Sequence, residues 1–511
     1  MSMQILAFIL YFLVVLAIGI YFFFKTKGGG EKEYFLGGRQ MGPWVTAMSA
    51  QASDMSGWLL MGFPGSILAF GMGKVWIGIG LGLGTILNWI LVARRLRRFS
   101  EAAGDSITLP QYLTNRFASS NPALKVTCAV IFLIAFTVYV ASAFVAGTNV
   151  FVSVCPALVG KEQLAMFIFA ALILVYTFLG GYKAVCWTDF FQGLMMLAAL
   201  LLVPIVMTAT GKFDASYSGA FAEGIAPFGS NPFTSSWNDV VSGLGWGLGY
   251  FGMPHIIVRF MGIKSASEVK KSAWIACIWV VLSLGAAIAL AILGRTYLLG
   301  GTESLAAKLI PASAQQMVFV EIVNNLFPAF IAGLLLAAII AASMSTADSQ
   351  LLVASSAFSS DFYQPIVRKN KASDAEMLWV GRFVVVIVAF VAFYIASTGI
   401  GKPGSWASSI MNMVENAWGL FGASFGPAIL LSLFWRRFNY AGALAAILVG
   451  AIVDIVCLYK LTGWLGGTYL YEIVPGFIAS FLAGVIVTLA APKPGKDVDA
   501  IFDAATAPVE K

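Results

Sequence analysis

A polar segment near residue 54 interrupts a stretch of the chain that is otherwise apolar. Residues 50–58 read Ala-Gln-Ala-Ser-Asp-Met-Ser-Gly-Trp, and Gly62, Pro64 and Gly65 follow. A carboxylate at membrane depth costs about 2.5 to 3.5 kcal/mol on insertion scales, so Asp54 marks a functional site. The glycines and the proline predict a broken helix, whose freed carbonyl groups can coordinate a ligand. A small cation is the first candidate.

A second polar stripe occupies residues 341–350, which read Ala-Ala-Ser-Met-Ser-Thr-Ala-Asp-Ser-Gln. On a helix, Ser345, Asp348 and Ser349 share one face and Thr346 lies beside it. Together with carbonyl groups of the broken segment, these side chains would supply about five oxygen ligands to a hard cation such as Na⁺. The alternative is that such hydroxyls bond to the preceding turn or join neighbouring helices.

The composition indicates which elements must position these residues. The chain of 511 residues is 59% hydrophobic and only 11% charged, which leaves too little polar surface for a soluble protein of this size. Its five cysteines form no CxxC pair, so neither a zinc site nor a disulfide framework is indicated. We therefore predict an all-α integral membrane protein.

Apolar runs long enough to cross about 30 Å of hydrocarbon predict about thirteen transmembrane helices. They lie at residues 4–24, 42–70, 74–93, 123–153, 162–180, 188–210, 239–261, 272–296, 314–348, 376–398, 405–435, 439–459 and 469–491. Several of them are longer than about 25 residues, which indicates tilted or broken helices.

Basic residues follow every second predicted helix, and the other connections carry few of them. The basic groups are Lys25, Lys27 and Arg39; Arg94, Arg95, Arg97 and Arg98; Lys183; Arg259, Lys264, Lys270 and Lys271; Arg368, Lys369 and Lys371; Arg436 and Arg437; and Lys493 and Lys496. By the positive-inside rule these connections are cytoplasmic, which places the N-terminus outside and the C-terminus in the cytoplasm. The net charge of +7 is thus a topology signal, and no nucleic-acid partner is indicated.

A second interrupted segment lies five predicted helices after the first. Residues 243–254 read Gly-Leu-Gly-Trp-Gly-Leu-Gly-Tyr-Phe-Gly-Met-Pro. Two interrupted helices at corresponding positions of two halves are typical of an inverted-repeat transporter. The expected division is an extra N-terminal helix with its cytoplasmic loop (1–38), a first repeat (39–210), a second repeat (211–436), and two C-terminal helices with a cytoplasmic tail (437–511).

The motifs resemble those of the sodium:solute symporter family, and most of all its bacterial proline-transporting branch. The resemblance runs from about residue 30 to 490 and rests on four motifs in order: Tyr34-Phe-Leu-Gly-Gly-Arg39 with Ser53-Asp-Met-Ser-Gly-Trp-Leu-Leu-Met-Gly62; Gly180-Gly181; Ala184-Val-Cys-Trp-Thr-Asp189; and Gly245-Trp-Gly-Leu-Gly-Tyr-Phe-Gly252 with Pro254-His255. It implies a LeuT-like fold in which the second to eleventh helices form a five-plus-five inverted repeat.

Carried over by position, the resemblance implies a sodium site. Its ligands would be the carbonyls of Ala52, Met55 and Ala342 and the hydroxyls of Ser345 and Thr346. Asp54 matches an aspartate needed for sodium coupling, which organises the site or binds the ion. Asp189 matches an aspartate on the sodium exit route, and a second ion site would use Asp189, Ser345, Asp348 and Ser349.

The resemblance also implies that the chain imports L-proline with Na⁺ across the inner (cytoplasmic) membrane. The matching solute-binding residues are Ser56, Gly57, Trp58, Tyr139, Trp246, Tyr250 and Pro254. An aromatic pocket suits a prolyl ring, and helix ends and polar groups suit its charges. No obligatory protein partner is indicated; the expected partners are L-proline and membrane lipid, and Na⁺ is the only expected ion.

Other functions stay open at this stage. Within the same family the solute would be pantothenate, a short monocarboxylate, a sugar or another amino acid. A sodium-responsive sensor or channel is a further alternative, whereas an enzyme is not expected because no nucleophile–base pair or metal-ligand spacing occurs. The roles of Asp348, Glu415 and His255 are not assigned.

Overall fold

The computed structural model describes residues 2–26, 30–210, 232–300 and 314–508, and this part of the chain is helical. Ten of the described helices are long and apolar enough to cross a membrane. They are Met3–Phe22, Met72–Ala102, Ala123–Val154, Gly181–Thr210, Val269–Arg295, Ala329–Val367, Asp374–Ser397, Ile410–Phe434, Tyr440–Trp464 and Ile473–Ala490. Nine of them coincide with one predicted span each. The tenth, Ala329–Val367, overlaps the span predicted at 314–348 but begins later and extends beyond it, and the first part of that span is the separate helix α14 (Val318–Leu326). The chain is a multi-pass membrane protein.

The other three predicted spans consist of shorter helices. The span at 42–70 is divided into α3 (Pro43–Asp54), a π-helical turn (Trp58–Gly62) and α4 (Phe63–Phe70). The span at 239–261 is divided into α10 (Trp237–Gly245), a 3₁₀ turn η7 (Trp246–Phe251) and α11 (Pro254–Gly262). Both breaks occur in the glycine-rich and proline-containing segments that predicted them.

The span at 162–180 belongs to α9, which runs over Glu162–Thr210 and bends at Gly181. Gly181 has φ +59°, a left-handed conformation that a residue with a side chain adopts only with strain. The spans predicted at 162–180 and 188–210 are therefore two helical segments that meet at the non-helical Gly181.

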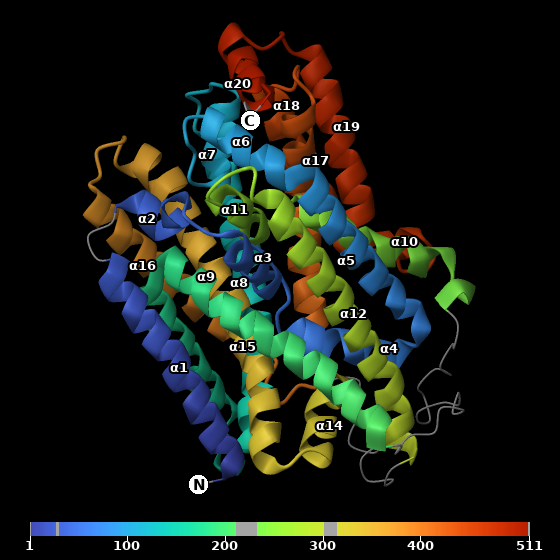
Figure 1. Ribbon diagram of the computed structural model, residues 1–511. Coiled ribbons are helices and arrows are strands. Elements are labelled where there is room, and N and C mark those ends of the chain that lie inside the picture. The colour runs from blue at the N-terminus through green and yellow to red at the C-terminus, as the bar shows by residue number, and fades with distance from the viewer. Residues whose placement is uncertain (1, 27–29, 211–231, 301–313, 509–511) are drawn as a thin grey trace.

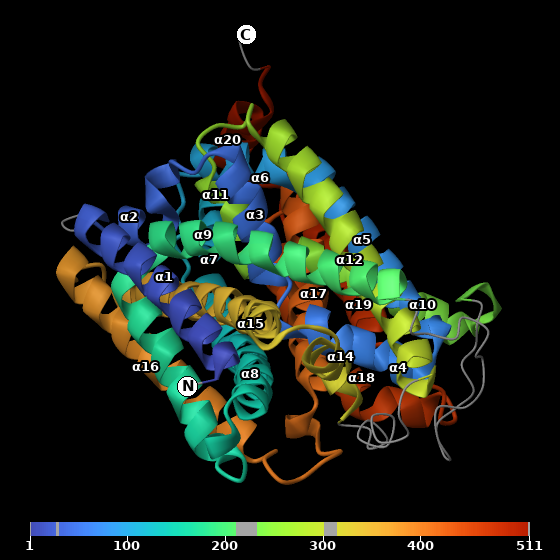
Figure 2. The same cartoon turned by 60° about the horizontal axis from the view of Figure 1, so that its bottom comes forward.

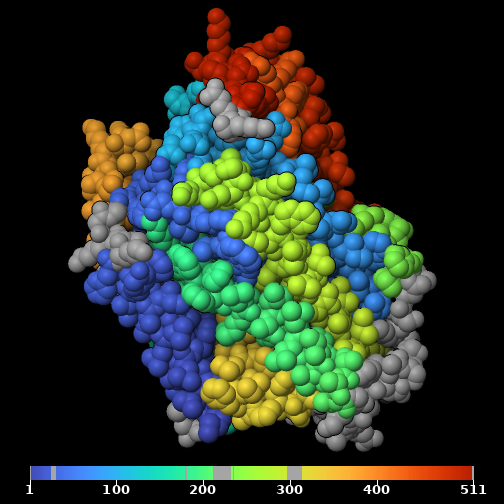
Figure 3. Space-filling model, in the orientation of Figure 1, coloured from blue at the N-terminus to red at the C-terminus, as the bar shows by residue number. Residues whose placement is uncertain are grey.

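The long helix α15 (Ala329–Ser356) lies in the interior of the molecule. Every residue from 335 to 356 is buried, and the helix packs against α1 (Met3–Thr26), α3, α8 (Ala123–Val154) and α9. Figure 1 shows α15 behind α9, Figure 2 shows it beside α1, and Figure 3 shows α1, α9 and α12 (Val269–Gly300) on the surface. The polar stripe on α15 thus faces protein rather than lipid.

The remaining helices complete the bundle around this centre. They are α5 (Val75–Leu87), α6 (Arg94–Ala102), α7 (Leu109–Arg116), α14 (Val318–Leu326), α16 (Asp374–Ser397), α17 (Ile410–Phe434), α18 (Tyr440–Trp464), α19 (Ile473–Ala490) and α20 (Lys496–Thr506), with α2 (Glu31–Leu36) at one end. The N-terminus and the C-terminal helix α20 lie at opposite ends of the molecule (Figure 1).

Glycines bring α5 into backbone contact with the second broken helix. A Cβ atom at Gly80 would lie 2.2 Å from the carbonyl oxygen of Gly243, and one at Gly84 would lie 2.4 Å from that of Gly247. Small residues at helix crossings let backbones approach closely in membranes. This crossing holds the segment that carries Trp246 and Tyr250 in place.

Candidate functional site

The first broken helix ends at Asp54, and its backbone turns away at Met55. Met55 has φ −91° and ψ +86°, which is not helical. The carbonyl oxygen of Asp54 accepts hydrogen bonds from Trp58 Nε1 at 3.1 Å and from the Tyr139 hydroxyl at 3.4 Å. The break is therefore stabilised by two aromatic side chains that the sequence places in the solute site.

The side chain of Asp54 joins the two broken helices. Its Oδ2 atom accepts a hydrogen bond from the hydroxyl of Tyr250, on the second broken helix, at 2.5 Å. The residue is fully buried, and Oδ1 has no hydrogen-bond partner among the described residues. A buried carboxylate with one orphaned oxygen is available to a cation or to a polar ligand.

The proposed sodium ligands meet where α15 crosses the first break. Ser345 Oγ donates to the carbonyl of Ala52 at 2.8 Å and to that of Ala342 at 3.1 Å. Thr346 Oγ1 donates to the same Ala52 carbonyl at 3.4 Å. These bonds are of the kind expected from the alternative, in which hydroxyls bond to the preceding turn and join neighbouring helices. The four residues are all buried, and the same oxygen atoms suit a hard cation, so the ion site stays a prediction.

Met55, the fifth predicted ligand, shows a different contact. Its sulfur accepts a hydrogen bond from Ser283 Oγ at 3.7 Å, on α12. Whether its carbonyl faces the hydroxyls of α15 stays a prediction.

A second polar cluster forms around Asp189 on α9. Its Oδ2 atom accepts hydrogen bonds from Ser49 Oγ at 2.7 Å and Ser53 Oγ at 3.1 Å, and pairs with Arg259 Nη2 at 3.2 Å. Arg259 also donates to Ser349 Oγ at 2.5 Å. The cluster therefore links both broken helices, α9 and α15, within buried protein.

Asp348 and Ser349 belong to this cluster. Ser349 Oγ donates to Asp348 Oδ1 at 3.3 Å and lies 2.9 Å from Ser53 Oγ. Three of the residues predicted for coupling or a second ion, Asp189, Asp348 and Ser349, are thus brought together. The guanidinium group of Arg259 lies among them. Because it neutralises part of the carboxylate charge, less negative charge is left to bind a second Na⁺.

Arg259 corrects one expectation from the sequence. The basic-residue pattern assigns it to a cytoplasmic loop, but it lies in α11 with no exposed surface. The apolar residues on both sides of it, such as Val258 and Phe260, already place it inside a predicted span. The rule that marks Asp54, that a charge at membrane depth is functional, would have identified Arg259 as well.

The predicted solute-binding residues are buried around the two breaks. Ser56, Trp58, Tyr139 and Tyr250 are each at most 1% exposed. Gly57 permits a close approach, because a Cβ atom there would lie 2.6 Å from Ala146 Cβ and 2.9 Å from Ser343 Oγ.

Pro254 is the first residue of α11, and His255 follows it. The His255 ring stands edge-on to Tyr139, with 5.9 Å between ring centroids, and to Phe136, with 5.5 Å. His255 therefore packs against Tyr139, one of the predicted solute residues, a contact that its place in the sequence did not reveal.

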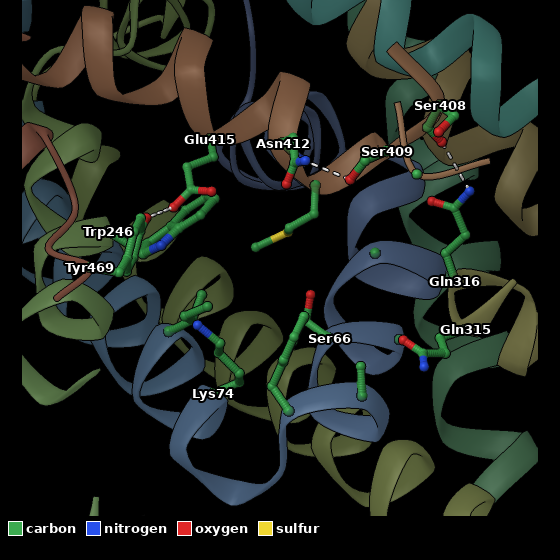
Figure 4. A pocket seen from close by; sticks show the side chains of 17 residues that line it. Ser66, Lys74, Trp246, Gln315, Gln316, Ser408, Ser409, Asn412, Glu415 and Tyr469 are labelled. Carbon is green, nitrogen blue, oxygen red and sulfur yellow. Dashed lines mark hydrogen bonds between the residues drawn. The ribbon is translucent and has the colours of Figure 1, made fainter. Parts of the chain in front are cut away.

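Trp246 connects this region to an open cavity of about 340 Å³. Figure 4 shows its indole beside Glu415 and Tyr469 on one wall, with Ser66 and Gln316 across the cavity. Of the predicted solute residues, only Trp246 lines this cavity. Its carbonyl accepts a hydrogen bond from Trp418 Nε1 at 2.7 Å, which holds the 3₁₀ turn against α17.

At the end of the molecule near α20, Arg39 connects several segments by hydrogen bonds. Its guanidinium donates to the carbonyls of Met261 at 2.6 Å and Ser106 at 2.9 Å, and to Asp105 Oδ1 at 2.7 Å. Burial alone would raise the pKa of Asp105, but hydrogen bonds and charge from Lys32 and Arg39 outweigh it and lower that pKa. These bonds tie the end of α11 to the connection between α6 and α7.

Comparison with known proteins identifies a family and relatives with similar sequences. The profile of the sodium:solute symporter family matches residues 34–450. An osmoregulated proline transporter of Bacillus subtilis (strain 168) is 41% identical over 95% of this chain and 94% of its own length. A sodium/proline symporter of Haemophilus influenzae is 39% identical over 98% of this chain and 97% of its own.

Solved structures show the same fold. A Na⁺-coupled sialic acid symporter in a substrate-bound, outward-open state superposes with a TM-score of 0.73 at 20% identity, covering 97% of this chain and 99% of that one. A nucleobase-cation-symport-1 family transporter in a closed conformation superposes with a TM-score of 0.56 at 16% identity, covering 92% and 98%.

Proposed function

This chain belongs to the sodium:solute symporter family, and on that premise we propose that it imports L-proline together with Na⁺ across the inner (cytoplasmic) membrane. The family consists of transporters, so the chain is a symporter and not an enzyme. Two relatives that share about 40% of its residues over nearly the whole length are named as proline transporters, which supports proline as the solute.

The proposed sodium site consists of the carbonyls of Ala52, Met55 and Ala342 and the hydroxyls of Ser345 and Thr346. The observation that carries it is that both hydroxyls lie within hydrogen-bond distance of the Ala52 carbonyl, at 2.8 and 3.4 Å. An ion at this point would connect α15 to the first broken helix.

We assign Asp54 to organising the break rather than to direct ion binding. Its carboxylate bonds Tyr250 and its carbonyl bonds Trp58 and Tyr139, so it fixes the three aromatic residues nearest to the break. Sodium binding at Ala52, two residues away, would order the same aromatic residues.

The proposed solute site lies between the two breaks, at Ser56, Gly57, Trp58, Tyr139, Trp246, Tyr250 and Pro254. Trp246 lies on the boundary between the cavity of Figure 4 and this buried region, which supports entry from that cavity. The aromatic faces suit the prolyl ring and attract its secondary ammonium by about 0.5 to 2 kcal/mol.

We assign Asp189, Asp348 and Ser349 to sodium coupling rather than to a second ion site. The positive charge of Arg259 within this cluster supports that choice. The cluster joins the two broken helices. Its rearrangement would therefore open a path for Na⁺ and solute at the end of the molecule where Arg39 lies.

The finer topology that we propose has thirteen transmembrane helices, of which the second to eleventh form the five-plus-five repeat. The N-terminus is outside and the C-terminus is cytoplasmic, and the parts are 1–38, 39–210, 211–436 and 437–511. The two interrupted helices and their meeting at Asp54 and Tyr250 support the repeat.

Competition for uptake tests the solute. The purified protein is reconstituted in proteoliposomes with an inward Na⁺ gradient, and uptake of radiolabelled proline is measured with excess unlabelled proline, pantothenate, lactate, glucose or alanine. Proline alone is expected to compete strongly. If excess unlabelled proline leaves uptake unchanged while another solute abolishes it, proline is not the substrate. The family membership would be unaffected by that result.

A further inference from the structure

A pair of buried carboxylates lies outside the sites described so far, where α17, α18 and α19 meet. Asp454 is in the middle of α18, and Glu472 directly precedes the first residue of α19. The two residues are only 2% and 3% exposed. Asp454 Oδ1 and Glu472 Oε1 each have no hydrogen-bond partner in the part of the chain that the structure describes.

The two unpartnered oxygens both approach Gly419 of α17 closely. A Cβ atom at Gly419 would lie 3.1 Å from Asp454 Oδ1 and 3.5 Å from Glu472 Oε1. The ring of Tyr471 lies 3.4 Å from the same point, and its hydroxyl donates a hydrogen bond to the Glu415 carbonyl at 2.8 Å. Glycine at this position therefore lets both carboxylates lie against α17.

The charges around the pair do not balance. Two carboxylates that share a buried space cannot both stay ionised without a cation. None of the ion pairs found within the described residues includes Asp454 or Glu472. Glu415, on α17, adds negative charge in this region, where its carbonyl accepts the Tyr471 hydroxyl and its carboxylate accepts the Tyr469 hydroxyl.

We propose that Asp454 and Glu472 bind one Na⁺ ion beside Gly419, at a site separate from the one on α15. Carboxylate oxygens are ligands of hard cations. The two carboxylate groups supply at most four oxygens, fewer than the six to eight that Ca²⁺ takes. The remaining negative charge is at the N-terminal end of α19, where the helix dipole stabilises it.

The position of this site gives the ion a structural consequence. Glu415, whose carbonyl accepts the Tyr471 hydroxyl, lines the cavity of Figure 4 together with Tyr469. The Tyr471 ring lies 5.1 Å from the ring of Trp246, centroid to centroid. An ion between Asp454 and Glu472 therefore holds the C-terminal helices against the second broken helix.

Equilibrium binding of ²²Na⁺ to the purified protein, measured by scintillation proximity without any solute, tests the proposal. The double variant Asp454→Asn/Glu472→Gln is expected to bind one Na⁺ fewer per chain than the unchanged protein. Asp497→Asn, an exposed carboxylate of α20, is the matched control and should bind as many ions as the unchanged protein.

A second variant separates this site from the one on α15 and from a folding defect. Gly419→Ala keeps both carboxylates but places a methyl group 3.1 Å from Asp454 Oδ1, and it too should lose one bound Na⁺. Combining Thr346→Ala with the double variant should remove one ion more than either change alone. Equal ²²Na⁺ binding by the unchanged protein, the double variant and Gly419→Ala would refute the proposal and leave a protonated pair, without touching the proline assignment.

Discussion

Asp54 is the residue at which the two broken helices are joined. Its carboxylate accepts the Tyr250 hydroxyl at 2.5 Å, and its carbonyl accepts Trp58 Nε1 at 3.1 Å. Ala52, two residues earlier, bonds the hydroxyls of α15. Ion and solute are thus proposed to act on the same three-residue segment, Ala52 to Asp54.

Tyr250→Phe removes the only hydrogen-bond donor found on the Asp54 carboxylate within the described residues. An unsatisfied buried acceptor costs about 1 to 3 kcal/mol. The Na⁺ concentration for half-maximal proline uptake is expected to rise roughly tenfold, which corresponds to about 1.4 kcal/mol. Tyr394→Phe, at an exposed tyrosine of α16, is the control and should change nothing. A normal sodium requirement in Tyr250→Phe would remove this link from the coupling mechanism.

Thr346→Ala deletes one proposed sodium ligand and leaves the helix intact. The expected result is more than a tenfold rise in the Na⁺ concentration for half-maximal uptake, because one of about five oxygens is lost. Sodium-titrated proline uptake at equal protein levels measures it. Thr398→Ala, at an exposed threonine that bonds its own helix, serves as the comparison. Identical sodium curves for the two variants would exclude the ion site on α15.

At the scale of elements, local sequence predicts where helices break but not what meets at the breaks. Glycine and proline near residues 54 and 254 interrupt a helix within one turn of their own position, and both breaks occur there. Tyr250 and Asp54 are 196 residues apart, so their bond depends on how whole helices pack. Arg259 was assigned to a loop because the charge pattern that sets topology does not distinguish a buried guanidinium from an exposed one.

The crossing of α5 with the second broken helix offers a test at this scale. Gly80→Ala would place a methyl group 2.2 Å from the Gly243 carbonyl and force the two backbones apart. Overpacking of this kind costs about 1 to 3 kcal/mol, so a lower melting temperature in detergent is expected, together with loss of uptake. Gly285→Ala, on α12 with nothing within 4 Å of its added methyl group, should melt like the unchanged protein or slightly higher. Equal melting temperatures in both variants would contradict a tight crossing.

The fold of the whole molecule matches that of a Na⁺-coupled sialic acid symporter, and ten long helices among the described residues provide the scaffold. Coupling requires that each ligand raises the affinity for the other. One charge moving down 100 mV supplies about 2.3 kcal/mol, and a tenfold Na⁺ gradient adds about 1.4 kcal/mol. One Na⁺ per zwitterionic proline therefore supports roughly 500-fold accumulation.

Sodium-titrated uptake of radiolabelled proline in proteoliposomes tests the central claim most directly. With an inward Na⁺ gradient and a negative interior, proline should accumulate against its gradient, and replacing external Na⁺ with K⁺ should reduce uptake to that of empty liposomes. Proline uptake that is equally fast and extensive without any Na⁺ would contradict the account.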